Sequence, residues 1–140
     1  MKIIIDNNII LDVFQNRKPF VKFSSKVLRL VETNQLKGYI TANSITDIYY
    51  VLNRSLENKQ KLYSTIDILL KLVDIIDVTA KDINKAFHPE IIDFEDELIS
   101  VCAERENINY IITRNTKDFI KSSVPAINPE EFITKFFENI

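Results

Sequence analysis

Short runs of β-branched and aromatic residues alternate with segments of helical periodicity along the chain, and this alternation limits the possible folds more than any other feature. The apolar runs fall at residues 1–5, 39–41, 75–78, 110–113 and 124–127. Strands that alternate with helices build parallel sheets that are covered on both faces. We therefore predict a single domain over residues 1–140, an α/β protein folded as a three-layer α/β/α sandwich around a four- or five-stranded parallel sheet.

Between the strands, apolar residues recur at helical spacing. The predicted helices cover residues 9–14, 20–35, 43–55, 56–72, 79–87 and 93–106, and a last helix starts at Pro129. Capping boxes are predicted for Ser44 with Asp47 and for Asp93 with Asp96, because each pair places a capping side chain three residues before an acid. Gly38 is predicted to stop the helix at 20–35.

The composition excludes several classes of site. The chain has 140 residues and one cysteine, Cys102, which rules out internal disulfides and cysteine-rich zinc sites. No apolar run is long enough to cross a membrane, so we expect a cytoplasmic protein without a membrane partner. Gly38 is the only glycine, and this excludes glycine-rich phosphate loops and dinucleotide fingerprints. Any phosphate chemistry must use other groups.

Basic residues gather in one segment although the net charge is −2. No acid occurs between Asp12 and Glu32, and Lys22, Lys26 and Arg29 fall on one face of the predicted helix. A basic stripe of this kind is typical of a surface that follows a phosphate backbone. An ordinary solvated helix face gives the same pattern, so both interpretations stay open.

Acidic residues occupy equivalent places in three strand–helix units. Asp6 follows the first strand, and Asp47 and Asp96 lie near the starts of two later helices. In right-handed β-α-β units the helices begin where the strands end, so these acids should converge on one edge of the sheet. Asn115 and Asp118 follow the strand at 110–113 and belong to the same edge.

Each acid taken alone is explained by helix capping, whereas the set points to a metal. Several carboxylates in one crevice repel one another unless a cation lies between them. Hard oxygen ligands suit Mg²⁺ or Mn²⁺. Such ions assist phosphodiester hydrolysis by activating water and by stabilising the charge on the phosphate oxygens.

Three blocks of sequence resemble the PIN domain family, in particular the bacterial, VapC-like PIN ribonucleases of toxin–antitoxin systems. The blocks are IIIDNNIILDVF at residues 3–14, YITANSITDIYYVL at 39–52 and DFEDELISVCAERENINYIITRNTKDF at 93–119. Together they extend over nearly the whole chain, and the last block is the most specific. The resemblance implies a PIN-like fold and a metal-dependent endoribonuclease that uses Mg²⁺ or Mn²⁺ to hydrolyse RNA.

The resemblance also implies roles for individual residues. The catalytic positions fall on Asp6, Asp47, Asp96 and Asn115, the metal-binding acids on Asp6, Asp47, Asp96 and Asp118, and the supporting polar positions on Asn8 and Thr113. Two residues depart from the family pattern. Asp47 stands where glutamate is usual and reaches one methylene less, and Asn115 stands where the family has an acid. The second departure puts a second metal ion in doubt.

Partners follow from the same resemblance. The resemblance implies RNA as the substrate, and the charge pattern offers Lys22, Lys26, Arg29 and Arg114 as the residues that bind it. A cognate antitoxin and, in a homodimer, a second copy of the chain are the candidate protein partners. One alternative is a PIN-like module that has lost catalysis and only binds RNA or protein. Another is a phosphoryl-transfer domain of receiver-like or haloacid-dehalogenase-like type. The second of these requires an acid two residues beyond the first, and that position is Asn8.

Overall fold

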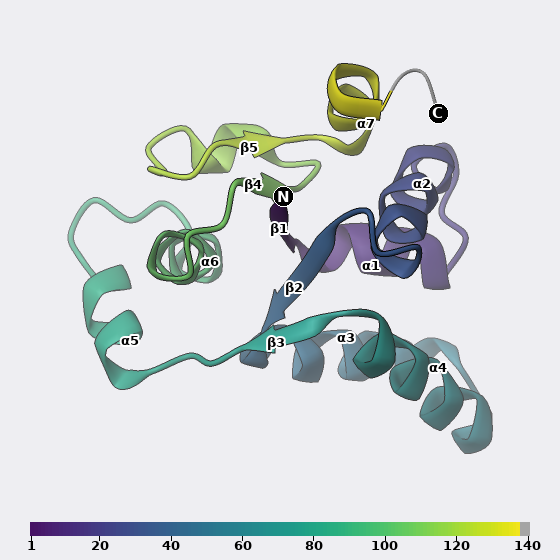
Figure 1. The fold of residues 1–140 in the computed structure, drawn as a ribbon. Coiled ribbons are helices and arrows are strands. Elements are labelled where there is room, and N and C mark those ends of the chain that lie inside the picture. Colours follow the sequence, from purple (N-terminus) through teal and green to yellow (C-terminus); the bar gives the residue numbers. More distant parts are fainter. Residues whose placement is uncertain (138–140) are drawn as a thin grey trace.

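The computed structural model of the chain describes residues 1–137 and confirms the predicted fold class. Five parallel strands form one sheet in the order β3-β2-β1-β4-β5 (Figure 1). The strands are β1 (Lys2–Ile5), β2 (Lys37–Thr41), β3 (Asp74–Ile76), β4 (Tyr110–Ile112) and β5 (Ala126–Ile127). Because all pairings are parallel, the carboxyl ends of the strands lie along one edge.

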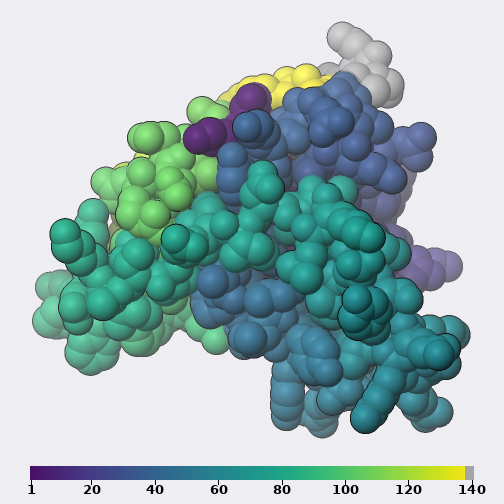
Figure 2. All heavy atoms as spheres, turned by 60° about the horizontal axis from the view of Figure 1, so that its bottom comes forward, coloured from purple at the N-terminus to yellow at the C-terminus, as the bar shows by residue number. Residues whose placement is uncertain are grey.

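Helices cover both faces of the sheet. They are α1 (Asn7–Phe14), α2 (Val21–Glu32), α3 (Ala42–Ser55), α4 (Lys59–Leu72), α5 (Ala80–Ala86), α6 (Phe94–Arg105) and α7 (Pro129–Phe137), with a 3-10 helix η1 (Thr116–Phe119). Helices α1 to α4 and α7 pack on one face and α5 and α6 on the other. Figure 2 shows α3 and α4 at one end of the surface and α5 at the opposite end. No helix within residues 1–137 is both long and apolar enough to cross a membrane.

The isoleucine runs build a separate core on each face. Ile3 and Ile5 of β1 and Ile112 of β4 pack against α1 to α4 and α7, whereas Ile4 and Ile111 pack against α5 and α6. Successive strand residues point to opposite faces, so an unbroken apolar run suits a strand that is buried on both sides. Each isoleucine removed from water in this way stabilises the fold by roughly 1.5–3 kcal/mol.

Asparagines end three of the helices. Asn16 after α1, Asn34 after α2 and Asn107 after α6 adopt left-handed backbone conformations, with φ of 50°, 61° and 55°. Asparagine tolerates this conformation at the position after a helix, where glycine is otherwise usual. The prediction that Gly38 stops α2 is wrong. Gly38 lies in β2, where a Cβ atom would stand 2.8 and 2.9 Å from the methyl carbons of Val31, so it allows α2 to pack on the sheet.

The start of α3 differs from the prediction. The helix begins at Ala42, directly after β2, and Thr41 occupies the N-cap position. Ser44 is buried, and its hydroxyl lies 2.8 Å from the hydroxyl of Thr41. The capping box of Ser44 with Asp47 is therefore wrong, and Asp47 lies in the second turn of α3. Because β2 continues directly into α3 without a loop, the helix begins earlier in the chain than predicted.

The starts of α4 and α6 agree only in part with those predicted from the sequence. The predicted helix at 56–72 begins only at Lys59, because the side chain of Asn58 accepts hydrogen bonds from the first-turn amides. Asp93 is confirmed as the cap of α6, since its Oδ1 accepts the backbone N–H of Asp96 at 3.0 Å. The return bond from Asp96 does not form among the described residues, so the capping box is incomplete.

Candidate functional site

The edge at the carboxyl ends of β1, β2 and β4 carries the predicted acids. Asp6 directly follows β1 and caps α1. Asp47 lies in the second turn of α3, which follows β2, and Asp96 lies in the first turn of α6. The loop after β4 adds Asp118 from η1. Residues that are far apart in the chain thus come to one edge because the sheet is parallel and each of these helices starts there.

Asp6 accepts hydrogen bonds from residues that follow β1 and β4 in the chain. Its Oδ1 accepts the backbone N–H of Asn7 at 2.8 Å, and its Oδ2 accepts the hydroxyl of Thr113 at 2.8 Å. Thr113 is fully buried, and its hydroxyl oxygen accepts the N–H of Asn115 at 3.0 Å. Burial raises the pKa of Asp6, although the two hydrogen bonds and the charge of Arg114 act in the opposite direction. The carboxylate of Asp6 is therefore fixed in place.

Asp96 is surrounded by like charge. Burial, together with the negative charges of Asp93, Asp6, Asp118 and Glu95, raises the pKa of Asp96 to about 7. A carboxylic acid with this pKa is close to half-protonated at neutral pH. Negative charge is therefore concentrated around Asp96 at this edge of the sheet.

Two acids of this cluster were not assigned to the site from the sequence. Partial desolvation raises the pKa of Glu95, and the charges of Asp47, Asp93 and Asp6 raise it further. The charge of Glu95 thus interacts with that of Asp47 as well as with the acids of α6. The side chain of Asp93 caps α6, and its charge also raises the pKa of Asp96. The signal in the sequence was the density of acids, four within the five residues Asp93–Glu97.

The side chains fit a divalent cation by type and by charge. Carboxylate and amide oxygens are the ligands that Mg²⁺ and Mn²⁺ prefer. Two buried amide oxygens, Oδ1 of Asn7 and Oδ1 of Asn43, lie in the first turns of α1 and α3 and have no hydrogen-bond partner within residues 1–137. No three acidic, histidine or cysteine side chains of that range are close enough to share one ion. The predicted acids therefore lie at the same edge of the sheet without forming a cluster of three ligands within the described residues.

The remaining predicted residues of this edge differ in burial. Asn115 is exposed directly before η1, and Asp118 is half-buried within it. Asn8 is half-buried in the first turn of α1. Their assigned roles, like those of the acids, stay predictions, because no bound ligand identifies them.

Arg114 is tied to a buried acid. Asp12 is fully buried, and its two carboxylate oxygens accept Nε and Nη2 of Arg114 at 3.1 Å each. Ser24 also donates to Asp12, and the guanidinium of Arg114 stacks on the ring of Phe20 at 3.9 Å. This arrangement joins α1 and α2 to the loop after β4. No local sequence pattern predicts the ion pair of Asp12 with Arg114, since the two residues lie 102 positions apart.

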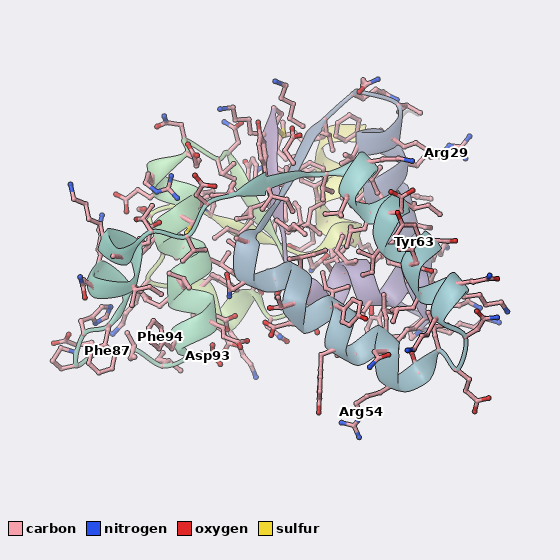
Figure 3. All side chains as sticks on the ribbon, turned by 90° about the horizontal axis from the view of Figure 1, so that it is seen from below. Arg29, Arg54, Tyr63, Phe87, Asp93 and Phe94 are labelled. Atoms are coloured by element: carbon pink, nitrogen blue, oxygen red, sulfur yellow. The ribbon has the colours of Figure 1, made fainter. Side chains whose placement is uncertain are left out.

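The basic stripe is divided by the structure. Lys22 lines a pocket together with Arg114 and Asn115, next to the acidic edge. Arg29 lies on the opposite side of the molecule from Asp93 (Figure 3). With Lys26 it borders hollows that reach α4 and α7. Of the three stripe residues, the structure brings only Lys22 toward the acids.

Comparisons with known proteins agree with this arrangement. The PIN domain family matches residues 2–117. Ribonuclease VapC1 of Aquifex aeolicus (strain VF5) is 28% identical over 140 residues, which cover 96% of this chain and 95% of that protein. VapBC2 from Rickettsia felis, solved bound to a DNA fragment from its promoter, matches with a TM-score of 0.69 and 23% identity over 91% of this chain and 98% of the other.

A second solved structure, a toxin-antitoxin complex from Klebsiella pneumoniae, matches with a TM-score of 0.66 and 22% identity over 90% of this chain and 96% of the other. At these identities the two structures show a shared fold. The family match runs from β1 to the start of η1 and includes Asp6, Asp47 and Asp96. The resemblance seen in the sequence is thereby confirmed, and the chain belongs to the PIN domain family.

Proposed function

We propose that the protein is a divalent-metal-dependent endoribonuclease that hydrolyses phosphodiester bonds of RNA. One observation carries the proposal: carboxylates that directly follow β1 and that lie in α3, α6 and η1 are placed at one edge of the sheet, where burial and like charge raise the pKa of Asp96 to about 7. Such a cluster is costly for a protein to keep unless it binds a cation. The likeness to a ribonuclease, VapC1, over nearly the full chain supports the same activity.

Each residue has a distinct part in the proposed reaction. A bound Mg²⁺ or Mn²⁺ supplies an activated water and stabilises the charge that develops on the phosphate oxygens. Asp6, Asp47, Asp96 and Asp118 are the proposed ligands. The hydroxyl of Thr113 fixes the direction in which Asp6 presents its carboxylate. Asn115 is exposed beside the acids and offers its amide to the phosphate.

The two departures from the family pattern are compatible with activity. Asp47 is shorter than glutamate, and Glu95 places an additional carboxylate close to it. Asn115 lacks a charge, and Asp118 supplies one three residues later, near Asp96. These two substitutions motivate the alternative of an inactive binding module, whereas the likeness to a ribonuclease, VapC1, supports the active enzyme.

We also propose that the protein is the toxin of a toxin–antitoxin pair. The fold that it shares with the solved toxin-antitoxin complex supports a cognate antitoxin as a partner. Co-expression with the product of the adjacent open reading frame tests this. A stable complex that suppresses RNA cleavage is the expected result, and a neighbour that neither binds nor inhibits contradicts it.

Cleavage of a labelled single-stranded RNA tests the enzymatic proposal. We expect cleavage with Mg²⁺ or Mn²⁺, none in excess chelator, and none from Asp96→Asn, whose side chain keeps the shape of aspartate. Glu104→Gln is the matched control, because it removes a charge from the exposed far end of the same helix. Full cleavage in chelator, or by folded Asp96→Asn, contradicts the proposal.

A further inference from the structure

A pocket of about 450 Å³ lies between the starts of α2 and α7 and the loop after β4. Its walls include Phe20 at the N-cap of α2, Lys22 and Phe23 in α2, Arg114 and Asn115 from the loop, and Asn128 before α7. Asn115 belongs both to this pocket and to the candidate catalytic edge. A ligand in the pocket is therefore a close neighbour of anything bound at the acids.

The walls combine aromatic rings with cations. Phe20 is 42% exposed although it is a large apolar residue, and Arg114 stacks on its ring at 3.9 Å. The ammonium group of Lys22 lies 5.2 Å from the centre of the Phe23 ring. Rings interleaved with cations are the surface on which proteins stack the bases of single-stranded nucleic acids and hold their phosphates.

Donors for a phosphate remain free in the same pocket. Asp12 occupies Nε and Nη2 of Arg114, whereas Nη1 makes no hydrogen bond among the described residues. Helix α2 starts without a side-chain cap and without an acid in its first turn. The N–H of Val21 donates to the carbonyl of Arg17 and that of Ser24 to the carbonyl of Phe20, so the N–H groups of Lys22 and Phe23 are the ones that can donate to an anion. Glu130 is the one acid that lines the pocket within the described part of the chain.

We propose that this pocket binds one nucleotide of the RNA strand, next to the phosphate that is cleaved. The base stacks on Phe20 and packs beside Phe23, and the phosphate of that nucleotide is bound by Lys22 and Arg114. This inference rests on the proposed ribonuclease function and adds to it a binding site for the substrate outside the acids. It also gives exposed Phe20 a role that packing does not explain.

Binding of a fluorescein-labelled ten-nucleotide single-stranded RNA, measured by anisotropy in chelator, tests the stacking contact apart from catalysis. Phe20→Leu keeps an apolar side chain beneath Arg114 but removes the ring, and we expect it to weaken binding roughly 5- to 150-fold. Phe20→Tyr keeps the ring and should bind as wild type does. Tyr63→Leu, which removes a ring that is 74% exposed on α4, is the matched control and should have no effect.

The phosphate contact is tested by the salt dependence of the same binding. Lys22→Gln should lower the slope of log affinity against log salt by about 0.7, the value for one phosphate contact on a single strand. Lys37→Gln removes the same charge from the exposed amino end of β2, at the edge of the sheet opposite the acids and outside the pocket, and should leave the slope unchanged. Equal slopes for the two variants overturn the phosphate contact.

The outcomes separate the pocket from the ribonuclease activity. If wild type cleaves RNA and Phe20→Leu binds as tightly as wild type, the pocket is overturned and the activity stands. If Phe20→Leu weakens binding but wild type does not cleave, the pocket stands and the activity falls. If wild type does not bind RNA, both fall. Should Phe20→Leu fail to fold, 4-thiouridine RNA cross-linked to wild type decides, because cross-links outside residues 19–24 and 114–115 overturn the pocket.

Discussion

The two acids Asp6 and Asp96 lie at the same edge of the sheet but are supported in opposite ways. Asp6 is 7% exposed and accepts hydrogen bonds from Asn7 and Thr113, and Arg114 contributes a compensating positive charge. Asp96 is half-buried, and the groups that act on its pKa are all acids. One carboxylate is part of the scaffold, and the other is in a position that the scaffold leaves unfavourable.

This difference indicates that Asp6 and Asp96 contribute to the candidate metal centre in different ways. A ligand that is fixed before binding loses little freedom when the ion arrives. A ligand that is repelled by its neighbours gains most from the ion, because the cation removes the repulsion. We therefore expect substitutions around Asp6 to affect folding, and substitutions around Asp96 to affect metal binding.

Removing Arg114 should break the supported side of the site most severely. Arg114→Met leaves the fully buried Asp12 without its ion-pair partner, and we expect a loss of about 3 kcal/mol in the free energy of unfolding. Urea denaturation in chelator measures this. Arg54→Met, on the exposed surface of α3, should change stability by less than about 0.5 kcal/mol. A similar small change for both variants shows that the Asp12 pair does not support the fold.

Added metal should stabilise the folded protein by binding at the site that contains Asp96. At a hundredfold excess of Mn²⁺ over its dissociation constant, wild type should gain about 2.7 kcal/mol, which a thermal melt detects. Asp96→Asn should lose most of this gain, because the amide cannot neutralise the ion. If the melting temperature of wild type does not move with millimolar Mn²⁺, the metal centre is refuted.

Replacing Thr113 tests whether Asp6 is held as tightly as the structure indicates. Thr113→Val keeps the shape of the side chain but removes the hydroxyl that donates to Asp6 and accepts from Asn115. The buried carboxylate of Asp6 and the N–H of Asn115 then lack this partner, and we expect a loss of about 2 kcal/mol in the free energy of unfolding. Thr134→Val on the exposed side of α7 is the control for urea denaturation. Equal stabilities of the two variants contradict the support assigned to Thr113.

The smallest expected effect concerns Asp96 without metal. The pKa of Asp96 is raised from 3.8 to about 7, so between these values the folded protein holds a proton that the unfolded chain has released. Stability therefore falls as the pH rises from about 4 to about 7. In chelator at pH 8, Asp96→Asn should be more stable than wild type by on the order of 1 kcal/mol, because solvent screens the partly exposed charge.

The same comparison repeated at pH 5 sharpens this result. Wild-type Asp96 is then mostly protonated, and the stabilities of the two proteins should converge. Urea denaturation across this pH range gives both values. A variant that is less stable than wild type at pH 8 indicates that Asp96 acts as a structural residue.

The sequence determined the layers of the fold and the approximate places of the acids. Isoleucine runs such as residues 3–5 mark strands buried on both faces, and Asp6 follows such a run directly. These are local signals of period and order, which a chain carries in any environment. Helix starts were less accurate where strand and helix join without a loop, as at Ala42.

Which groups each polar side chain contacts depends on the tertiary structure. Asp6 and Thr113 are 107 positions apart, and Asp12 and Arg114 are 102 apart, yet both pairs form hydrogen bonds. The order of the strands places β4 beside β1, and nothing in the local pattern of either segment specifies that neighbour. The charge of Glu95 on the site and the pocket at Phe20 arise in the same way, because both depend on which elements the packing brings together.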